Sequence, residues 1–247
     1  MNSKNLLMKF QYDGTNYHGY QIQPEVSTIQ KSIEDALWQI TGEEISVNGC
    51  SRTDAGVHAV EYACSFMTNS PIPAERFHIV LNNKLPDDIR ALSCLEVNKD
   101  FHARFDTKSK TYRYKIDCSK EPEVFTRNYE WQIKTKLNVS LMQEACKYFI
   151  GEKDFKSFMT SGAQVESTVR TIFSLEVIDK HDDHVEIYIK ANGYLYNMVR
   201  IITGTLVNVG LMRYSPEYVN EIISACNRDK AGPTAPPQGL SLYKVEY

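Results

Sequence analysis

The chain has 247 residues, of which 42% are hydrophobic and 24% charged, and its formal net charge at pH 7 is −3. This length allows one large domain or two modest ones, and the apolar content is sufficient for a buried core. No apolar run approaches the roughly 20 residues that a membrane-spanning helix needs, and the first residues lack the apolar region of a signal peptide, so we expect a cytoplasmic protein.

The six cysteines are scattered along the chain, and they neither form a Cys-x-x-Cys pair nor accompany a histidine cluster. This spacing argues against a metal site and against a disulfide framework, and it favours reduced, mostly buried thiols. The slightly negative net charge does not by itself indicate a nucleic-acid-binding protein. Net charge says little about local potential, however, so the distribution of the cations matters more.

The first predicted element is a strand over residues 6–12, which ends at the turn-forming sequence Asp-Gly-Thr of residues 13–15. A loop rich in aromatic and amide side chains follows over residues 16–24 and includes Tyr20 and Gln21. Such a loop is either an ordinary connection or a surface that contacts a ligand, and its composition alone does not separate the two.

A helix is predicted after this loop. Ser27 and Gln30 can form a capping box, and the apolar side chains that follow recur at helical spacing. Gly42 is expected to end the helix. Residues 44–47 then alternate polar and apolar like a short strand, which Gly49 interrupts.

The segment Gly49–Ala59 reads Gly-Cys-Ser-Arg-Thr-Asp-Ala-Gly-Val-His-Ala and leads into a second strand over residues 62–66. The alanine and glycine after Asp54 leave its carboxylate open to a substrate. Arg52 would keep this carboxylate ionised, because a nearby cation favours the charged form. An ionised and accessible carboxylate can act as a nucleophile, whereas the alternative is an ordinary ion pair at a turn.

Pro73 opens a second helix, on which Phe77 and Leu81 face inward, and residues 89–97 form a further strand. The first part of the chain therefore runs strand, helix, strand, strand, helix, strand. This order predicts an α+β module with helices on one side of a largely antiparallel sheet.

The most basic stretch of the chain follows, and residues 108–116 within it are predicted to form a strand. Alternation would place Tyr112 and Tyr114 on one face of that strand and Arg113 on the other. Cations interleaved with aromatic rings suit a nucleic acid, whose phosphates attract charge and whose unstacked bases stack on rings. The alternative is a surface strand with solvated cations. The cations of the stretch are Arg104, Lys108, Lys110, Arg113 and Lys115.

The remaining sequence repeats the same kinds of element. Residues 131–134 read as a strand, and Ser140 with Gln143 predicts the capped start of a helix. Two longer strands are predicted over residues 170–178 and 185–191.

A helix ending at Gly210 is predicted after residue 192, and Arg200 is a charge inside its apolar run. Such a charge must find a partner or remain solvated. The loop over residues 234–240 contains two adjacent prolines, whose rigidity could press Leu240 against a substrate or could serve only to shape the chain. A last strand over residues 242–246 follows.

Two parts of similar element order thus emerge, and we place the boundary near residue 105. The expected domains are an N-terminal α+β half, residues 1–105, and a C-terminal α+β half, residues 106–247. We expect a cleft between the halves, with Asp54 facing it from one side and Tyr112 and Arg200 facing it from the other.

The string Arg-Thr-Asp-Ala-Gly-Val-His-Ala at residues 52–59 closely resembles the signature of the pseudouridine synthases that modify the anticodon stem-loop of transfer RNA, the TruA family. The similarity spans nearly the whole chain. It includes Tyr-Asp-Gly-Thr, Phe-His-Ala-Arg-Phe, Lys-Thr-Tyr-Arg-Tyr, Met-Val-Arg, the pattern Ala-Pro-x-x-Gly-Leu and the final Val-Glu-Tyr. The resemblance implies two α+β halves sharing an extended antiparallel sheet, a homodimer, no cofactor, and one tRNA held across two subunits.

By this resemblance, Asp54 is the catalytic aspartate, Arg52 acts beside it, and Tyr112 is the active-site tyrosine. The implied reaction is the isomerisation of uridine to pseudouridine in tRNA. Arg200 is expected near Asp54 or near an RNA phosphate. The candidate substrate-binding residues are Arg200, Leu240, Arg104, Lys110, Arg113, Tyr20 and Gln21.

Three positions depart from the family pattern. Ser51 stands where a glycine is usual, Tyr20 replaces a common tryptophan, and Asn197 replaces a frequent histidine. All three are expected near the site, so a divergent paralogue that modifies another RNA is one alternative. A catalytically inactive RNA-binding module is another. A carboxylate-dependent glycosidic hydrolase would usually need two acids, and the central motif supplies one.

Overall fold

The computed structural model describes residues 3–160, 162, 165–180 and 183–247. This part of the chain contains ten strands and five α-helices, and most strand pairs are antiparallel. The predicted α+β class with a mainly antiparallel arrangement is therefore confirmed. The chain divides into a first unit, residues 1–108 with 241–247, and a second unit, residues 109–240.

The first unit is built on four strands in the order β4-β1-β3-β10. Strand β1 (Lys4–Tyr12) pairs antiparallel with β3 (His58–Thr68) and with β4 (Ile89–Val97). Strand β10 (Leu240–Glu246) pairs parallel with β3 through Ser241 and His58. The last strand of the described sequence therefore belongs with the first unit.

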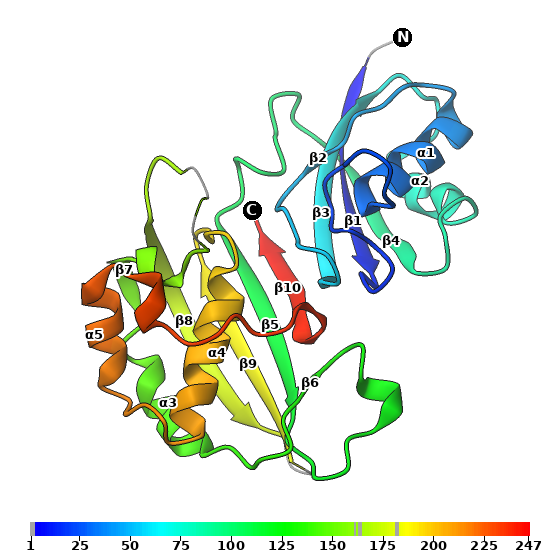
Figure 1. Cartoon of the computed structure of the whole chain (residues 1–247). Helices are drawn as coiled ribbons and strands as arrows, with labels where there is room; N and C mark the ends of the chain where they lie inside the picture. Colours follow the sequence, from blue (N-terminus) through cyan, green and yellow to red (C-terminus); the bar gives the residue numbers. More distant parts are fainter. Residues whose placement is uncertain (1–2, 161, 163–164, 181–182) are drawn as a thin grey trace. The chain divides into compact units, whose positions relative to one another are not determined.

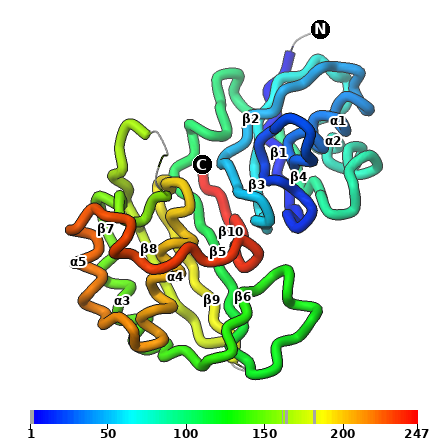
Figure 2. The backbone as a smooth tube through the Cα atoms, in the orientation of Figure 1, coloured from blue at the N-terminus to red at the C-terminus, as the bar shows by residue number. Residues whose placement is uncertain are grey.

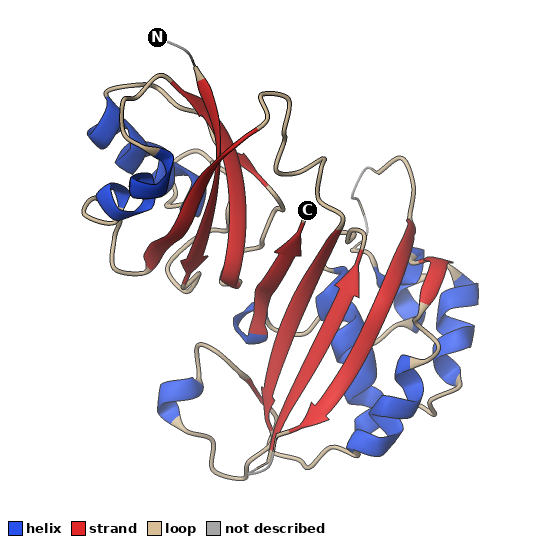
Figure 3. Ribbon diagram, turned by 180° about the vertical axis from the view of Figure 1, so that it is seen from behind, coloured by secondary structure: helices blue, strands red, loops and turns tan. Residues whose placement is uncertain are grey.

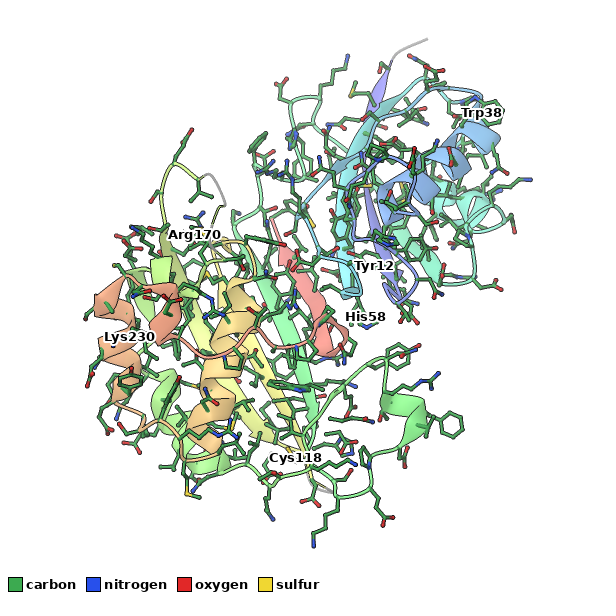
Figure 4. All side chains as sticks on the ribbon, viewed as in Figure 1. Tyr12, Trp38, His58, Cys118, Arg170 and Lys230 are labelled. Carbon is green, nitrogen blue, oxygen red and sulfur yellow. The ribbon has the colours of Figure 1, made fainter. Side chains whose placement is uncertain are left out.

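Helices α1 (Ile29–Thr41) and α2 (Ala74–Leu81) lie on one side of the strands of this unit (Figure 1). The buried face of α1 is made by apolar residues at helical spacing, whereas Trp38 is exposed (Figure 4). Gly42 ends α1 in the left-handed region, with φ 72°, as the sequence predicts. The cap at the other end differs from the prediction, because Thr28 and not Ser27 accepts the hydrogen bond from the Lys31 amide, at 3.4 Å.

The predicted strand at residues 44–47 is wrong. Strand β2 covers only Asn48–Gly49, which pair with β3. The amide of Val47 donates instead to the Glu34 carboxylate on α1, at 3.0 Å. A backbone donor already taken by a helix side chain cannot extend a strand ladder, so the pairing starts one residue later.

The second unit has its main strands in the order β5-β9-β8-β7, all antiparallel to their neighbours. A short strand, β6, pairs parallel with β5. Helices lie on one face of these strands, and the view from behind shows the opposite face of the strands (Figure 3). The strands are β5 (Ser109–Asp117), β6 (Trp131–Gln132), β7 (Gly151–Asp154), β8 (Val169–Asp179) and β9 (His184–Ala191), and the helices are α3 (Val139–Cys146), α4 (Met198–Gly210) and α5 (Tyr218–Ala225).

The predicted capping box of α3 also differs from the structure, because Asn138 caps this helix and accepts from the Leu141 amide at 3.1 Å. Helix α4 is buried along almost its whole length. The chain after α5 crosses α4 on its way to β10 (Figure 2). This crossing is close, since a Cβ on Gly204 would lie 1.8 Å from the Pro233 carbonyl oxygen.

None of the helices in the described residues combines the length and the apolar character needed to cross a bilayer.

Candidate active site

The turn that carries Arg52 and Asp54 joins β2 to β3 in the first unit. It begins where the Cys50 amide donates to the Ala63 carbonyl at 2.9 Å, and the chain from residue 51 to residue 54 has no regular secondary structure. The Arg52 side chain is exposed and Asp54 is half-buried, whereas Thr53 between them is buried. The two predicted chemical groups therefore lie at the surface of the unit, on either side of an anchored residue.

Thr53 is the anchor of the turn. Its carbonyl accepts from the Tyr20 amide at 3.1 Å, and its hydroxyl is 2.8 Å from the Tyr12 hydroxyl. Gly19 allows this approach, because a Cβ there would lie 2.6 Å from the Thr53 carbonyl oxygen and its φ is +91°. Tyr12 and His58 mark the ends of β1 and β3 that support the turn (Figure 4).

The residues after Asp54 are also fixed by backbone hydrogen bonds. The Val57 amide donates to the Asp54 carbonyl at 3.2 Å, and the Gly56 amide donates to the Tyr17 carbonyl at 3.3 Å. The Gly14 amide donates to His58 Nδ1 at 3.0 Å. The two loops of the first unit, residues 13–20 and 51–57, are thereby held together, so the Asp54 backbone is preorganised.

Tyr20 and Gln21 occupy different environments, although they are adjacent. Tyr20 is 3% exposed, and its ring stacks on Tyr62 with the centroids 4.4 Å apart. Gln21 is exposed. Tyr20 therefore supports the turn from inside the unit, while Gln21 faces solvent.

Arg104, also in the first unit, is exposed, and its guanidinium group lies 5.6 Å from the ring centroid of Phe105. The Phe105 ring is itself 74% exposed and contacts the His102 ring. A cation and an exposed ring are thus presented side by side, an arrangement that can contact a phosphate and a base.

Tyr112 lies on β5 of the second unit and is 5% exposed. Its ring meets the Tyr194 ring edge-to-face, with centroids 5.0 Å apart. The Tyr194 hydroxyl lies 2.8 and 2.7 Å from the carbonyl oxygens of Lys110 and Ile189, and it can donate its one proton to either of them. Burial raises the pKa of Tyr194 well above its usual range, with a smaller contribution from Tyr112, so the Tyr194 hydroxyl stays a donor and holds the ring beside Tyr112.

The alternation predicted for β5 is confirmed, because Tyr112 and Tyr114 are buried while Arg113 between them is only partly buried. Lys110 has the same parity in the strand as Tyr112, and Arg113 has the opposite one. The structure therefore places these two candidate cations on opposite faces of the strand. Arg113 lies opposite Tyr188 in the ladder with β9.

Arg200 is partly buried near the start of α4. Its Nε donates to the Ala235 carbonyl at 2.7 Å, and its Nη1 donates to the Asn197 side-chain oxygen, also at 2.7 Å. The Ala235 amide donates back to the Arg200 carbonyl at 3.1 Å. The charge in the apolar helix is thus used in part to hold the proline-containing loop that precedes Leu240.

Tyr114 holds the same loop from β5, since its hydroxyl donates to the Pro236 carbonyl at 2.7 Å. A Cβ on Gly239 would lie 2.6 Å from the Tyr114 ring, so only glycine fits there. Leu240 follows directly and is 5% exposed. Burial raises the pKa of Tyr114 far above its usual range, and the Arg200 charge partly opposes this shift.

The prediction from sequence misses the residues that support the turn, above all Tyr12, Tyr62 and His58. A tyrosine in a predicted strand is usually interpreted as a core residue. Only the position of its hydroxyl in the structure shows whether it also forms a hydrogen bond to the turn. Among the described residues, no group of three or more histidine, cysteine or acidic side chains is arranged to hold a metal ion.

Comparison with known proteins gives a family match over two long stretches of the chain. Residues 8–106 and 145–247 match a family model described as tRNA pseudouridine synthase. The chain is 47% identical to tRNA pseudouridine synthase A 2 of Clostridium perfringens and 48% identical to tRNA pseudouridine synthase A of Clostridium acetobutylicum, in each case over 244 residues, which are 99% of this chain and 100% of the relative.

A chain of a solved structure described as a Cbf5-Nop10-Gar1 complex is similar over 96% of the present chain and 57% of the other chain. The sequence identity is 13% and the TM-score is 0.33. That likeness is too weak to bear on fold or function.

Proposed function

The chain belongs to the tRNA pseudouridine synthase family, and from this premise we propose that it acts on uridines of the anticodon stem-loop with Asp54 as its nucleophile. The enzyme is an isomerase. The bond between C1′ of the ribose and N1 of uracil breaks, and a bond between C1′ and C5 forms. Nothing is oxidised and no group leaves, so the reaction requires no redox cofactor.

A uridine stacked in a stem must first leave the helix, at a cost of a few kcal/mol. Arg52 supports this step in the proposal, because it is exposed beside Asp54 and can enter the vacated space. There its guanidinium group can pair with a phosphate or with the Asp54 carboxylate.

Asp54 then attacks the sugar or the uracil ring, the C1′–N1 bond breaks and the base rotates, and the bond to Asp54 is broken again as C1′ is joined to C5. The proposal assigns Tyr112 to the uracil ring, which it would hold by stacking, and to removal of the C5 proton at the end. The edge-to-face contact with Tyr194 supports this assignment, because it fixes the orientation of the Tyr112 ring.

The remaining candidates contact the RNA in the proposal. Arg104 and Gln21 are exposed on the first unit, and Lys110 is partly buried on the second. Arg113 would contact RNA only from the face of β5 opposite to Tyr112. Tyr20 would act from inside the first unit, and Arg200 and Leu240 would act through the loop that Arg200 holds.

We also propose, on the family relationship, that the enzyme works in the cytoplasm as a homodimer that holds one tRNA. In this proposal the two halves expected from the sequence are residues 1–105, which carry Asp54, and residues 106–247, which carry Tyr112, although residues 241–247 lie in the first unit of the structure.

The observation that carries the proposal is the anchored turn, which presents Asp54 between fixed backbone groups in a chain of this family. The test is tritium release from tRNA transcripts containing 5-tritiated uridine. Asp54→Asn should fold normally and release no tritium, because an amide cannot replace the nucleophile. Asp35→Asn is the matched control, since Asp35 is an exposed acid on α1 that pairs with Lys31.

Substantial turnover by Asp54→Asn would refute the nucleophile. A wild-type protein that binds the transcript but releases no tritium from it would instead be an RNA-binding module. Pseudouridine mapping in RNA from cells with and without the gene identifies the modified positions, and sites outside the anticodon stem-loop would indicate a divergent paralogue.

A further inference from the structure

Three tyrosine rings lie together inside the first unit, next to the turn that carries Asp54. Tyr62 on β3 is fully buried, and the Tyr20 ring stacks on it at 4.4 Å with an interplanar angle of 26°. The centroid of the Tyr12 ring lies 5.6 Å from the centroid of the Tyr62 ring. This arrangement fixes the direction in which the Tyr62 hydroxyl points, because the ring has neighbours on more than one side.

The Tyr62 hydroxyl reaches the backbone of Ser51. It donates to the Ser51 carbonyl and accepts from the Ser51 amide, the latter at 3.4 Å. One side chain thus contacts both polar backbone groups of the residue that precedes Arg52. With Thr53 held by Tyr12 and Tyr20, the backbone is fixed on both sides of Arg52 and immediately before Asp54.

We propose that Tyr62 is a positioning residue for Asp54, acting through the backbone of Ser51. The inference rests on the proposed role of Asp54. Its physical basis is that a nucleophile must be held close to its productive position, and a misplacement of about 1 Å can cost roughly 100-fold in rate. Tyr62 would supply this restraint without touching the substrate.

The hydroxyl, rather than the ring, carries the restraint. Burial raises the pKa of Tyr62 well above its usual range, with further contributions from Tyr20 and Cys50, so the hydroxyl remains protonated and can donate throughout the working pH range. Without it, the Ser51 carbonyl would lose a donor in a partly buried position and the turn could shift to find another.

The space around the Tyr62 hydroxyl is closed on the side of β2. A Cβ on Gly49 would lie 2.1 Å from the hydroxyl oxygen and 2.5 Å from the Tyr20 ring. Two of the three departures from the family pattern, Ser51 and Tyr20, both contact Tyr62: the Ser51 backbone bonds to its hydroxyl, and the Tyr20 ring stacks on its ring. The two positions therefore belong to the same structural support of the turn.

The test is Tyr62→Phe, which keeps the buried ring and removes only the hydroxyl. We expect kcat for tritium release to fall about tenfold or more, with KM for the tRNA transcript unchanged within about twofold. Ile33→Val is the control for stability, because it deletes a methyl group from a fully buried residue of α1, outside the sequence of the turn. It should leave kcat within about twofold.

Melting temperatures of both variants separate positioning from folding. A loss of kcat in Tyr62→Phe that persists well below its melting temperature, and that Ile33→Val does not show, supports the inference. A normal kcat in Tyr62→Phe, or a loss that disappears when the assay is cooled, overturns it. Turnover by Asp54→Asn would overturn the proposed nucleophile and this inference together, whereas a normal kcat in Tyr62→Phe beside an inactive Asp54→Asn overturns this inference alone.

Discussion

At the scale of single residues, burial controls the chemistry of the side chains that are not part of the site. All six cysteines lie in the described residues and none of them forms a disulfide; five are buried, while Cys226 is partly exposed. Burial raises the pKa of the Cys118 thiol to about 11 and that of Cys94 and Cys146 to about 12. These groups are neutral thiols at physiological pH, and they pack as small apolar residues.

The thiol shifts predict a dependence of stability on pH. A thiol whose pKa is higher in the folded than in the unfolded state stabilises the fold below the unfolded pKa, which is 9.0, and this contribution is lost as the pH rises toward 12. We therefore expect the denaturant midpoint to fall as the pH rises above about 9, and Cys94→Ala should weaken that dependence. A midpoint equally sensitive to pH in the variant would contradict the assignment to Cys94.

The thiols also differ in their exposure to solvent. Alkylation with iodoacetamide, followed by mass spectrometry, measures this difference. In native protein at pH 8, Cys226 should be alkylated first, because the others are buried and the thiolate is the reactive form. Cys226→Ser is the control, and it should abolish the early modification.

At the scale of the elements, the start of helix α1 is predicted with the right type of capping residue but one position too early. Thr28 is 1% exposed and caps the helix, although the serine before it has the same chemistry. The sequence places a cap in this region but does not decide between neighbouring hydroxyl residues. That choice follows from where the preceding loop attaches, and here the Ile29 amide donates to the Gly19 carbonyl.

The cap assignment predicts a difference between two adjacent alanine variants. Thr28→Ala should lower the free energy of unfolding by about 1 kcal/mol, because it removes the acceptor of the Lys31 amide. Ser27→Ala should change it by less than about 0.5 kcal/mol, since that side chain is exposed and is not the cap. Equal losses in urea unfolding would mean that both hydroxyl groups serve the helix end.

The order of strands and helices could be read from the sequence because hydrophobic periodicity and glycine stops are local properties. The ends of β8 and β9 agree with the prediction to within a residue for this reason, and α4 ends at Gly210 as predicted, although it begins at Met198 and not just after residue 192. The strand expected at residues 44–47 failed because its Val47 amide bonds to Glu34, a partner distant in sequence. Such pairings are set by tertiary contacts, which periodicity does not encode.

The candidate site likewise contains residues that can be predicted from the sequence and others that depend on tertiary contacts. Asp54 and Arg52 are candidates because their charges are visible in the sequence and because the string around them resembles the signature of the family. The contact between Tyr62 and Ser51 could not be predicted from the sequence. It depends on the position that the Tyr62 hydroxyl takes once β3 is paired with β2. The separation of Lys110 from Arg113 on opposite faces of β5, by contrast, follows from the alternation that the sequence itself predicts.

At the scale of the whole molecule, a formal net charge of −3 must be reconciled with a polyanionic substrate. Local groups of cations can bind RNA on a chain whose net charge is negative, because the potential near a surface depends on nearby charges. Arg104, beside the exposed Phe105, is one such cation in the first unit. The affinity for tRNA should therefore depend on salt despite the net charge.

This expectation can be measured as the slope of log Kd against log salt for a tRNA transcript. Arg104→Ala should weaken binding and reduce the magnitude of the slope by about 1, which corresponds to one phosphate contact. Lys31→Ala is the control, because Lys31 is an exposed cation already paired with Asp35. An unchanged slope in Arg104→Ala would remove Arg104 from the RNA-binding surface.

The parallel pairing of β10 with β3 has a consequence for how the protein is made. The ribosome translates β3 early and β10 only after the entire second unit, so a growing polypeptide carries an incomplete first unit for most of its synthesis. Until β10 arrives, the backbone of β3 at His58 and Ala59 lacks this neighbour. Nascent or prematurely terminated chains would therefore expose a strand edge, where association with other chains begins.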